Sequence, residues 1–282
     1  MAFPAQHQKH QPGDEHAMDP APESFMKNYK AADKLKDKVA LISGGDSGIG
    51  RAVAIGYAKE GAEVAFIYRD EDKDAEITKE HIENEGRRCL TFRGDIASKA
   101  FCDDVVKQVI SRFGKLDILV NNAAEQHYCE EFEDIPEEQI RRTFDSNIFG
   151  AMFLTQAALP QLKERGGCVI NTASITAYQG QPVLMDYATT KGAVVGFTRA
   201  LAGNLADKGV RVNAVAPGPI WTPLIPASFP AEKVVHFGES SKMGRPGQPD
   251  EVAPAYIYLA CADSSYVTGQ TIHINGGAIV GG

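Results

Sequence analysis

The stretch KVALISGGDSGIGRAVAIGYAKEG, residues 38–61, decides the fold of this chain. It opens with a short apolar run (38–43), passes through a glycine-rich turn, and continues into a run (50–61) whose apolar spacing predicts a helix ending at Gly61. A strand, a tight turn and a helix in this order form the first half of a βαβ unit. Glycine lets the backbone turn sharply, and the free N–H groups at the start of a helix favour an anion. The stretch therefore predicts a nucleotide-binding α/β fold.

Two phosphate-binding motifs can be compared with this turn. Gly45 and Gly50 fit the spacing of a P-loop, but Arg51 follows them, and the phosphate-binding lysine and the Mg²⁺-binding hydroxyl are both missing. The GxGxxG dinucleotide fingerprint is also absent, because Gly44, Gly48 and Gly50 form the pattern GxxxGxG. A glycine turn after the first strand of a βαβ series still predicts nucleotide binding.

Strands and helices alternate along the rest of the chain. Strands are predicted at 38–43, 63–68, 88–94, 116–122, 168–174, 210–217 and 270–275. Helices are predicted at 50–61, 74–86, 99–114, about 136–163, 186–208 and 249–261. The strands are apolar without clean alternation, so both faces of the sheet should be covered. This pattern predicts one Rossmann-type doubly wound α/β domain, with a seven-stranded parallel sheet flanked by helices and ligands bound beyond the carboxyl ends of the strands.

Residues 1–37 differ from the rest of the chain, because they are rich in proline, histidine, glutamine and charge and have no apolar periodicity. Such a segment cannot bury enough apolar surface to form a core of its own. We expect this leader to be extended or partly disordered, or to lie across the main domain with Phe25, Met26 and Tyr29 as anchors. Its histidines lack a cysteine or carboxylate cluster that would complete a site, so no metal is predicted.

The remainder of the chain, residues 38–282, is expected to form the main domain. Its segment 222–247 has no clear periodicity and is a candidate substrate loop or lid. Phe229, His236 and Phe237 lie in this loop and either shape the pocket or pack the loop down.

Composition limits the classes of function. The net charge of −8 argues against partners such as nucleic acid or an anionic membrane surface. No run approaches the roughly 20 apolar residues of a membrane-spanning helix, and the N-terminus has no apolar signal-peptide core. The five cysteines are scattered and form no CxxC motif, so they are expected to be free thiols in the cytoplasm. Among them Cys129, with His127 nearby, is interpreted as a plain loop residue.

The run DYATTK, residues 186–191, places Tyr187 and Lys191 one helical turn apart on the same face. An unperturbed tyrosine, with a pKa of about 10, is a poor acid–base catalyst near neutral pH. A cation one turn away would favour the phenolate and lower that pKa. Many helices carry such a pair by chance, so its meaning depends on the surrounding residues.

The glycine turn resembles that of a known family. Gly44, Gly48, Ile49 and Gly50 resemble the cofactor turn of the single-domain short-chain dehydrogenase/reductases, and the resemblance extends over residues 38–277. NNAA (121–124) is similar to the family's NNAG segment, with Ala124 in place of glycine. Ser174 lies thirteen residues before Tyr187, the family's usual interval, and Tyr187 with Lys191 matches YxxxK. RVNAVAPGPIWT (211–222) and SSYVTGQTIHINGG (264–277) resemble its later segments, and the leader resembles the N-terminal extension of some bacterial members.

The resemblance implies roles for individual residues. It implies a catalytic set in which Tyr187 is the acid/base, Ser174 binds the substrate oxygen, Lys191 holds the nicotinamide ribose and Asn147 continues a water relay. It implies that Asp95 meets the adenine. The cofactor-binding residues so implied are Gly44, Asp46, Ser47, Gly48, Ile49, Gly50, Tyr68, Arg69, Asp95, Ile96, Asn122, Ala123, Ala124, Tyr187, Lys191, Pro217, Gly218, Ile220 and Thr222.

The end of the second strand bears on the choice of nicotinamide. An acidic residue there accepts from the 2′-hydroxyl of NAD, whereas an arginine pairs with the 2′-phosphate of NADP. Tyr68 stands where NAD-specific relatives tend to have aspartate, and Arg69 follows it. The acidic residues 70–72 add negative charge and so favour NAD instead. Ser47 stands where some NADP-dependent relatives carry a basic residue. NADP(H) is favoured and NAD(H) is possible.

The resemblance implies an NAD(P)(H)-dependent oxidoreductase that transfers a hydride between the cofactor and a small carbonyl or alcohol. An aldehyde or ketone reductase is the leading expectation, with a sugar or polyol dehydrogenase and a 3-oxoacyl reductase as alternatives. A nucleotide-binding sensor without turnover is the alternative of a different class. Members of the family commonly form tetramers, so the resemblance implies a homotetramer.

Overall fold

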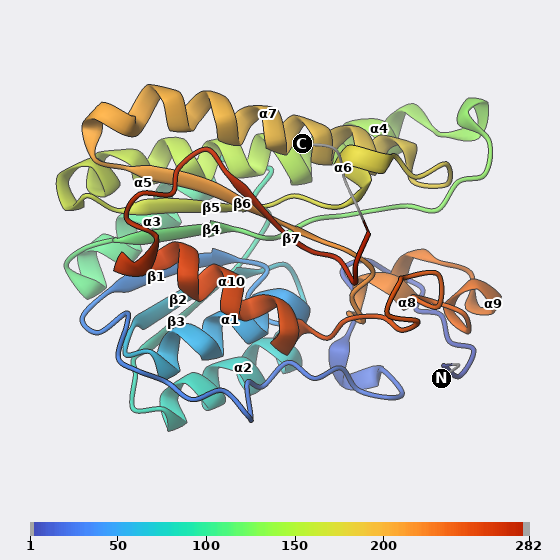
Figure 1. Ribbon diagram of the computed structural model, residues 1–282, viewed down its shortest axis with the longest axis horizontal. Coiled ribbons are helices and arrows are strands. Elements are labelled where there is room, and N and C mark those ends of the chain that lie inside the picture. The colour runs from blue at the N-terminus through green and yellow to red at the C-terminus, as the bar shows by residue number, and fades with distance from the viewer. Residues whose placement is uncertain (1–2, 279–282) are drawn as a thin grey trace.

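Seven parallel strands form the central sheet in the order β3-β2-β1-β4-β5-β6-β7 (Figure 1). The computed structural model describes residues 3–278. The strands are β1 (Val39–Ser43), β2 (Glu63–Tyr68), β3 (Cys89–Arg93), β4 (Ile118–Asn121), β5 (Cys168–Thr172), β6 (Arg211–Pro217) and β7 (Thr271–Ile274). The chain order reverses between β1 and β4, so the crevice of the doubly wound sheet opens at the carboxyl ends of these two strands. The predicted fold class is confirmed.

Helices cover both faces of the sheet, as Figure 1 shows. They are α1 (Gly48–Lys59), α2 (Asp72–Asn84), α3 (Lys99–Phe113), α4 (Glu137–Phe144), α5 (Ala151–Arg165), α6 (Thr176–Gln179), α7 (Met185–Leu205), α8 (Leu224–Ser228), α9 (Ala231–Val234) and α10 (Pro249–Ala260). The helices α1, α2 and α10 lie on one face, and α3, α5 and α7 lie on the other.

The first strand explains why the sheet needs helices on both faces. Ala40 and Ile42 belong to the apolar core beneath α1 and α10, whereas Val39 and Leu41 belong to the core beneath α3 and α5. All four side chains are at most 1% exposed. Because successive side chains of a strand point to opposite faces, a strand buried on both faces must be apolar throughout.

The helical stretch expected at 136–163 is broken in its middle. Between α4 and α5 the backbone widens into a π-helical segment, η3 (Asp145–Gly150). Gly150 packs directly on Ile96, where an added Cβ would lie 2.7 Å from the nearest side-chain atom. Apolar periodicity cannot distinguish such a π segment from an ordinary α-helix, and π segments often occur at functional sites.

The leader lies across the main domain, and its described part (residues 3–37) is largely extended with one short 3₁₀ turn, η1 (Glu15–Ala17). In Figure 1 it runs from beside α8 and α9, past the lower helices, to β1. Met26 is 1% exposed and packs in the core beside α1, whereas Phe25 and Tyr29 pack at its rim. We expected the leader either to be extended or partly disordered, or to lie across the main domain. Its described part lies across the domain.

Candidate active site

A cavity of 630 Å³ lies at the carboxyl ends of the strands. Its walls come from the glycine turn, the segments that follow β2 to β6, the start of α7 and the loop around α8 and α9. The predicted cofactor residues other than Gly50 all line this cavity, although the sequence stretches that carry them are far apart. This position matches the ligand crevice of a doubly wound sheet.

The glycine turn can accept a dinucleotide because side chains are absent where the backbone is tightest. A Cβ on Gly50 would lie 1.7 Å from the carbonyl oxygen of Gly44, so no other residue fits there. Gly44 itself adopts a φ of +64° and packs against the backbone of Ala123. The turn leads into α1, whose N-terminal N–H groups favour a phosphate. The turn therefore fits the phosphates of a dinucleotide.

Three of the four predicted catalytic residues meet in this cavity. Tyr187 and Lys191 extend from α7, and Ser174 lies just beyond the end of β5. Lys191 Nζ donates to the carbonyl oxygen of Thr172 at 2.7 Å and lies 5.4 Å from the centre of the Tyr187 ring. The cavity thus places a phenol, an amine and a hydroxyl next to the glycine turn.

The electrostatics of the pair differ from the prediction. Burial raises the pKa of Tyr187 to about 12, and a contact with the Ser174 side chain partly opposes that rise. Burial lowers the pKa of Lys191 to about 7. We expected Lys191 to lower the pKa of Tyr187, but desolvation dominates for both groups, and the lysine is directed to a backbone carbonyl. Burial therefore favours the neutral form of both side chains.

The fourth residue, Asn147, lies in the π segment outside the main cavity. Its Oδ1 accepts from the N–H of Glu125 at 2.8 Å, while its Nδ2 donates to the Glu125 carbonyl oxygen at 2.9 Å and to Thr190 at 3.1 Å. The amide therefore fixes the loop that follows β4. Asn147 and Lys191 also line a second cavity of 10 Å³, close to the volume that one water needs.

The segment at the end of β2 brings both positively and negatively charged side chains to the cavity wall. Tyr68 bonds to Asp72 at 2.9 Å, and Arg69 Nη1 lies 3.5 Å from a carboxylate oxygen of Glu125. Asp46 and Glu71 are buried in the same wall. Burial, and next the carboxylate of Glu71, raise the pKa of Asp46 to about 7, and burial also raises the pKa of Glu71.

Asp95 is paired in a way that the sequence does not reveal. Arg142 Nη1 lies 2.7 Å from Asp95, and its Nε donates to Glu125 at 2.8 Å. Burial alone would raise the pKa of Asp95, but the N–H of Ala97 and the Arg142 guanidinium lower it. Arg142 thereby favours the ionised form of Asp95 and also pairs with Glu125 in the cavity wall. No motif signals this arginine, because it comes from α4, a helix that otherwise looks like solvated surface.

The substrate end of the cavity is formed by the predicted loop. Phe229, His236 and Phe237 line it, and His236 is exposed and bonds to Glu239 at 3.0 Å. Phe229 and Phe237 also pack in an apolar cluster with Trp221. Phe229 and Phe237 thus line the pocket and also pack the loop against the apolar cluster around Trp221.

Sequence reasoning missed several wall residues. Glu125 and Gln126 follow the NNAA segment, Arg142 lies on α4, and Pro12 and Gly13 come from the leader. The pair EQ after NNAA was the only signal available, since contacts between the leader and the cavity depend on the folded chain.

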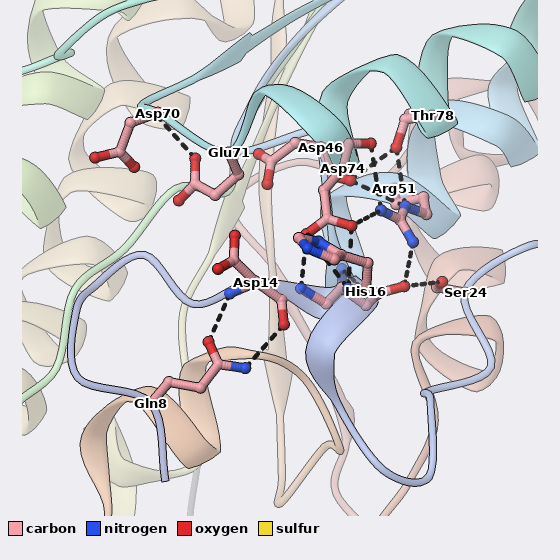
Figure 2. Close-up of polar contacts among 12 residues, drawn as sticks. Gln8, Asp14, His16, Ser24, Asp46, Arg51, Asp70, Glu71, Asp74 and Thr78 are labelled. Carbon is pink, nitrogen blue, oxygen red and sulfur yellow. Dashed lines mark hydrogen bonds and ion pairs between the residues drawn. The ribbon is translucent and has the colours of Figure 1, made fainter.

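One group in the described part of the chain has metal-ligand spacing. Ligand atoms of Asp14, His16 and Asp74 lie within 4.8 Å of one another. Asp74 already pairs with Arg51 at 3.1 Å and accepts from the Glu15 N–H at 2.7 Å (Figure 2). A cation would compete with that guanidinium, so we retain the prediction of no metal.

The loop residue Cys129 is held by backbone pairing, with its N–H donating to Val183 at 3.0 Å. His127 Nε2 lies 3.4 Å from Glu125. These contacts are consistent with the interpretation of both as loop residues. Within residues 3–278, no helix is long and apolar enough to cross a membrane.

A doubly wound sheet whose crevice holds a glycine turn beside a tyrosine, a lysine and a serine defines a dinucleotide-dependent oxidoreductase. Residues 44–278 match the family model described as enoyl-(acyl carrier protein) reductase. The chain belongs to the short-chain dehydrogenase/reductase family, whose members act on alcohol and carbonyl groups.

Similar proteins match along nearly the whole chain. The uncharacterized oxidoreductase YhxC of Bacillus subtilis is 58% identical over 99% of this chain and 97% of its own length. A glucose and ribitol dehydrogenase homolog of Oryza sativa is 52% identical (99% and 98%). The NADPH-dependent aldehyde reductase 1 of Arabidopsis thaliana is 51% identical (99% of each). These matches include the leader.

A solved structure confirms the fold. The short chain dehydrogenase of Burkholderia cenocepacia, in complex with NADP, has a TM-score of 0.80 and 33% identity. The match covers 86% of this chain and 98% of that one.

Proposed function

We propose that this chain is an NAD(P)(H)-dependent aldehyde or ketone reductase in which Tyr187 is the acid/base. The observation that carries the proposal is the presence of Ser174, Tyr187 and Lys191 in the same cavity as the glycine turn. The bound nicotinamide supplies the hydride for a carbonyl carbon, or accepts it from an alcohol.

The protein's own residues handle the proton. In reduction, Tyr187 gives its proton to the carbonyl oxygen as the hydride reaches the carbon, and the Ser174 hydroxyl donates a hydrogen bond to that oxygen. Burial keeps the Tyr187 phenol protonated at neutral pH, but the raised pKa also makes it a weaker acid than a free tyrosine, and the hydrogen bond with Ser174, which lowers that pKa, favours the proton transfer. Lys191 and Asn147, which share the small second cavity, form the route by which a water returns the proton.

NADP(H) is the favoured cofactor and NAD(H) remains possible. Arg69 offers a cation at the end of β2, and the Arabidopsis and Burkholderia proteins are described with NADPH and NADP. Asp46 and Glu71 offer acceptors that suit an unphosphorylated ribose. The ratio of kcat/KM with the two cofactors tests the preference, and a hundredfold preference for NAD would contradict it.

The function is tested by following NADPH oxidation over a panel of aldehydes, ketones and oxoacyl thioesters. We expect turnover with small aldehydes or ketones, and the loss of this turnover in Tyr187→Phe. A protein that binds NADPH in titration but turns over no member of the panel, in either direction, would be a sensor instead.

A sugar or polyol dehydrogenase is the second candidate, because the rice relative carries that description. The reverse assay, reduction of NADP⁺ or NAD⁺ with sugars and polyols, decides between the two. Faster turnover of polyols than of aldehydes at equal concentrations would favour the dehydrogenase. Activity with oxoacyl thioesters alone would favour a 3-oxoacyl reductase.

We also propose that the protein is a homotetramer in the cytoplasm. The five cysteines are all free in the structure, which suits a reducing compartment.

A further inference from the structure

The leader forms part of the active-site wall. Pro12 and Gly13 line the cavity itself. Gly13 is buried against the lid, here defined as residues 221–237, which contain α8 and α9. A Cβ on Gly13 would lie 2.6 Å from the carbonyl oxygen of Pro223 and 2.9 Å from the Cβ of Ala227. The leader backbone therefore packs on the lid with no space for a side chain.

A chain of amide contacts joins the leader to the lid through the loop after β4. The Gln11 side chain pairs with the backbone of Gln126, accepting from its N–H at 3.1 Å and donating to its carbonyl oxygen. The Gln126 side chain in turn donates to Ser228 of α8 at 2.8 Å. Gln126 is 4% exposed and follows Glu125, which Asn147 holds. The loop after β4 and the lid are thus both connected to the leader through Gln126.

The far end of the lid is also held by the leader. Phe3 stacks on Trp221 with ring centres 3.9 Å apart and planes 9° apart. The Trp221 indole N–H donates to the carbonyl oxygen of Pro20 at 2.8 Å, and the Gln8 N–H donates to Pro226 at 2.7 Å. Trp221 is fully buried by these contacts.

On its other side the leader is anchored at the start of α1. The buried Glu15 carboxylate accepts from the Gly48 N–H at 2.5 Å, pairs with Arg51 Nη1, and accepts from Ser24. Arg51 also bonds to Asp74 at 3.1 Å (Figure 2). A carboxylate at a helix N-terminus is favourable, and here an arginine neutralises it. The same segment therefore contacts the cofactor turn and the lid.

We propose that residues 3–24 position the substrate lid against the cofactor turn, and that Gln11 and Gly13 determine how tightly substrate is held. This inference rests on the proposed reductase function. Gln11 does not line the cavity, so its effect passes through the position of the lid. Gly13 does line the cavity, and a Cβ added there would meet the lid atoms of Pro223 and Ala227. Loosening the lid weakens substrate binding more than cofactor binding, because the Glu15 contact at Gly48 is retained and Thr222 is the lid residue that packs on the cofactor turn.

The test compares full-length wild type with Gln11→Ala and Gly13→Ala, and uses Lys9→Ala as the matched control. Lys9 lies in the same segment but is exposed. For each protein we would measure KM and kcat with one aldehyde, the Kd of NADP⁺, and hydrogen exchange in lid peptides. We expect KM to rise about tenfold in both test variants, which is the scale of a small change in pocket fit. The Kd of NADP⁺ should rise by a smaller factor than KM, and lid exchange should accelerate.

Several results would overturn the proposal. Unchanged KM and unchanged lid exchange in both variants would remove the positioning role, and so would equal effects from Lys9→Ala. A fall in thermal stability with KM unaltered would indicate a purely structural contact and would also overturn it. If wild type shows no turnover on any substrate, the proposed function fails, and the exchange measurement alone decides whether Gln11 and Gly13 hold the lid.

Discussion

Tyr187 and Lys191 show how burial can outweigh a favourable neighbour. Both lie one turn apart on α7, yet the tyrosine's pKa rises to about 12 and the lysine's falls to about 7. The phenol is therefore protonated at neutral pH, and it can donate that proton although it is a weaker acid than free tyrosine. Tyr187→Phe removes the proton and leaves the ring packing, so we expect kcat to fall by 10²–10⁴, the usual contribution of acid–base catalysis. The NADP⁺ Kd, measured by titration, should stay within a few-fold. A variant that keeps more than about a tenth of wild-type kcat would contradict the assignment.

Asp46 gives a prediction for stability at the same scale. Its pKa in the folded protein, about 7, lies above its ordinary value of 3.8, so the folded state binds a proton more tightly than the unfolded chain. Asp46 therefore becomes destabilising as pH rises from about 4 to 7, and the full penalty is present above 7. Asp46→Asn should raise Tm more at pH 8 than at pH 5. Thermal unfolding at both pH values checks this, and an equal shift at the two would count against a buried, charged Asp46.

At the scale of elements, the glycine turn is the least replaceable part of the site. A Cβ on Gly50 would meet the Gly44 carbonyl oxygen at 1.7 Å, which only a change of backbone could relieve. Gly50→Ala should weaken NADP⁺ binding at least tenfold in a direct titration. The matched control is Gly56→Ala on the same helix, where the added methyl meets the movable end of Ile257 at 3.1 Å. Similar affinity losses in both variants would indicate damage to α1 instead of to the turn.

The elements also show what the sequence can and cannot predict. The strand around Ala40 and the helix of Tyr187 were predictable because two-sided burial and helical period leave a local pattern. The residues of the glycine turn could be placed because their motif is local. The π segment at Asn147 was not predictable, since it looks like a continuous helix. Arg142 and Gly13 were missed because they reach the cavity through contacts between distant segments.

At the scale of the whole molecule, the side of the sheet covered by α5 and α7 has an apolar surface. Phe149 and Met152 are 44% and 42% exposed, three residues apart. On α7, the positions of Gly192 and Gly196 have no neighbouring atom within 4 Å of an added Cβ. Exposed large apolar side chains, and helix positions without side chains that permit close approach, are both compatible with helix packing between subunits. We therefore expect this side to form an interface of the homotetramer.

Light scattering tests that assembly. Wild type should have four times the mass of one chain, and Phe149→Glu combined with Met152→Glu should give smaller species because buried carboxylates oppose association. Lys73→Glu on α2, an exposed position on the opposite face of the sheet, should leave the mass unchanged. A monomeric wild type would contradict the tetramer. A tetramer that persists in the double variant would place the interface on another surface, and the exposed phenylalanine would then need a different explanation.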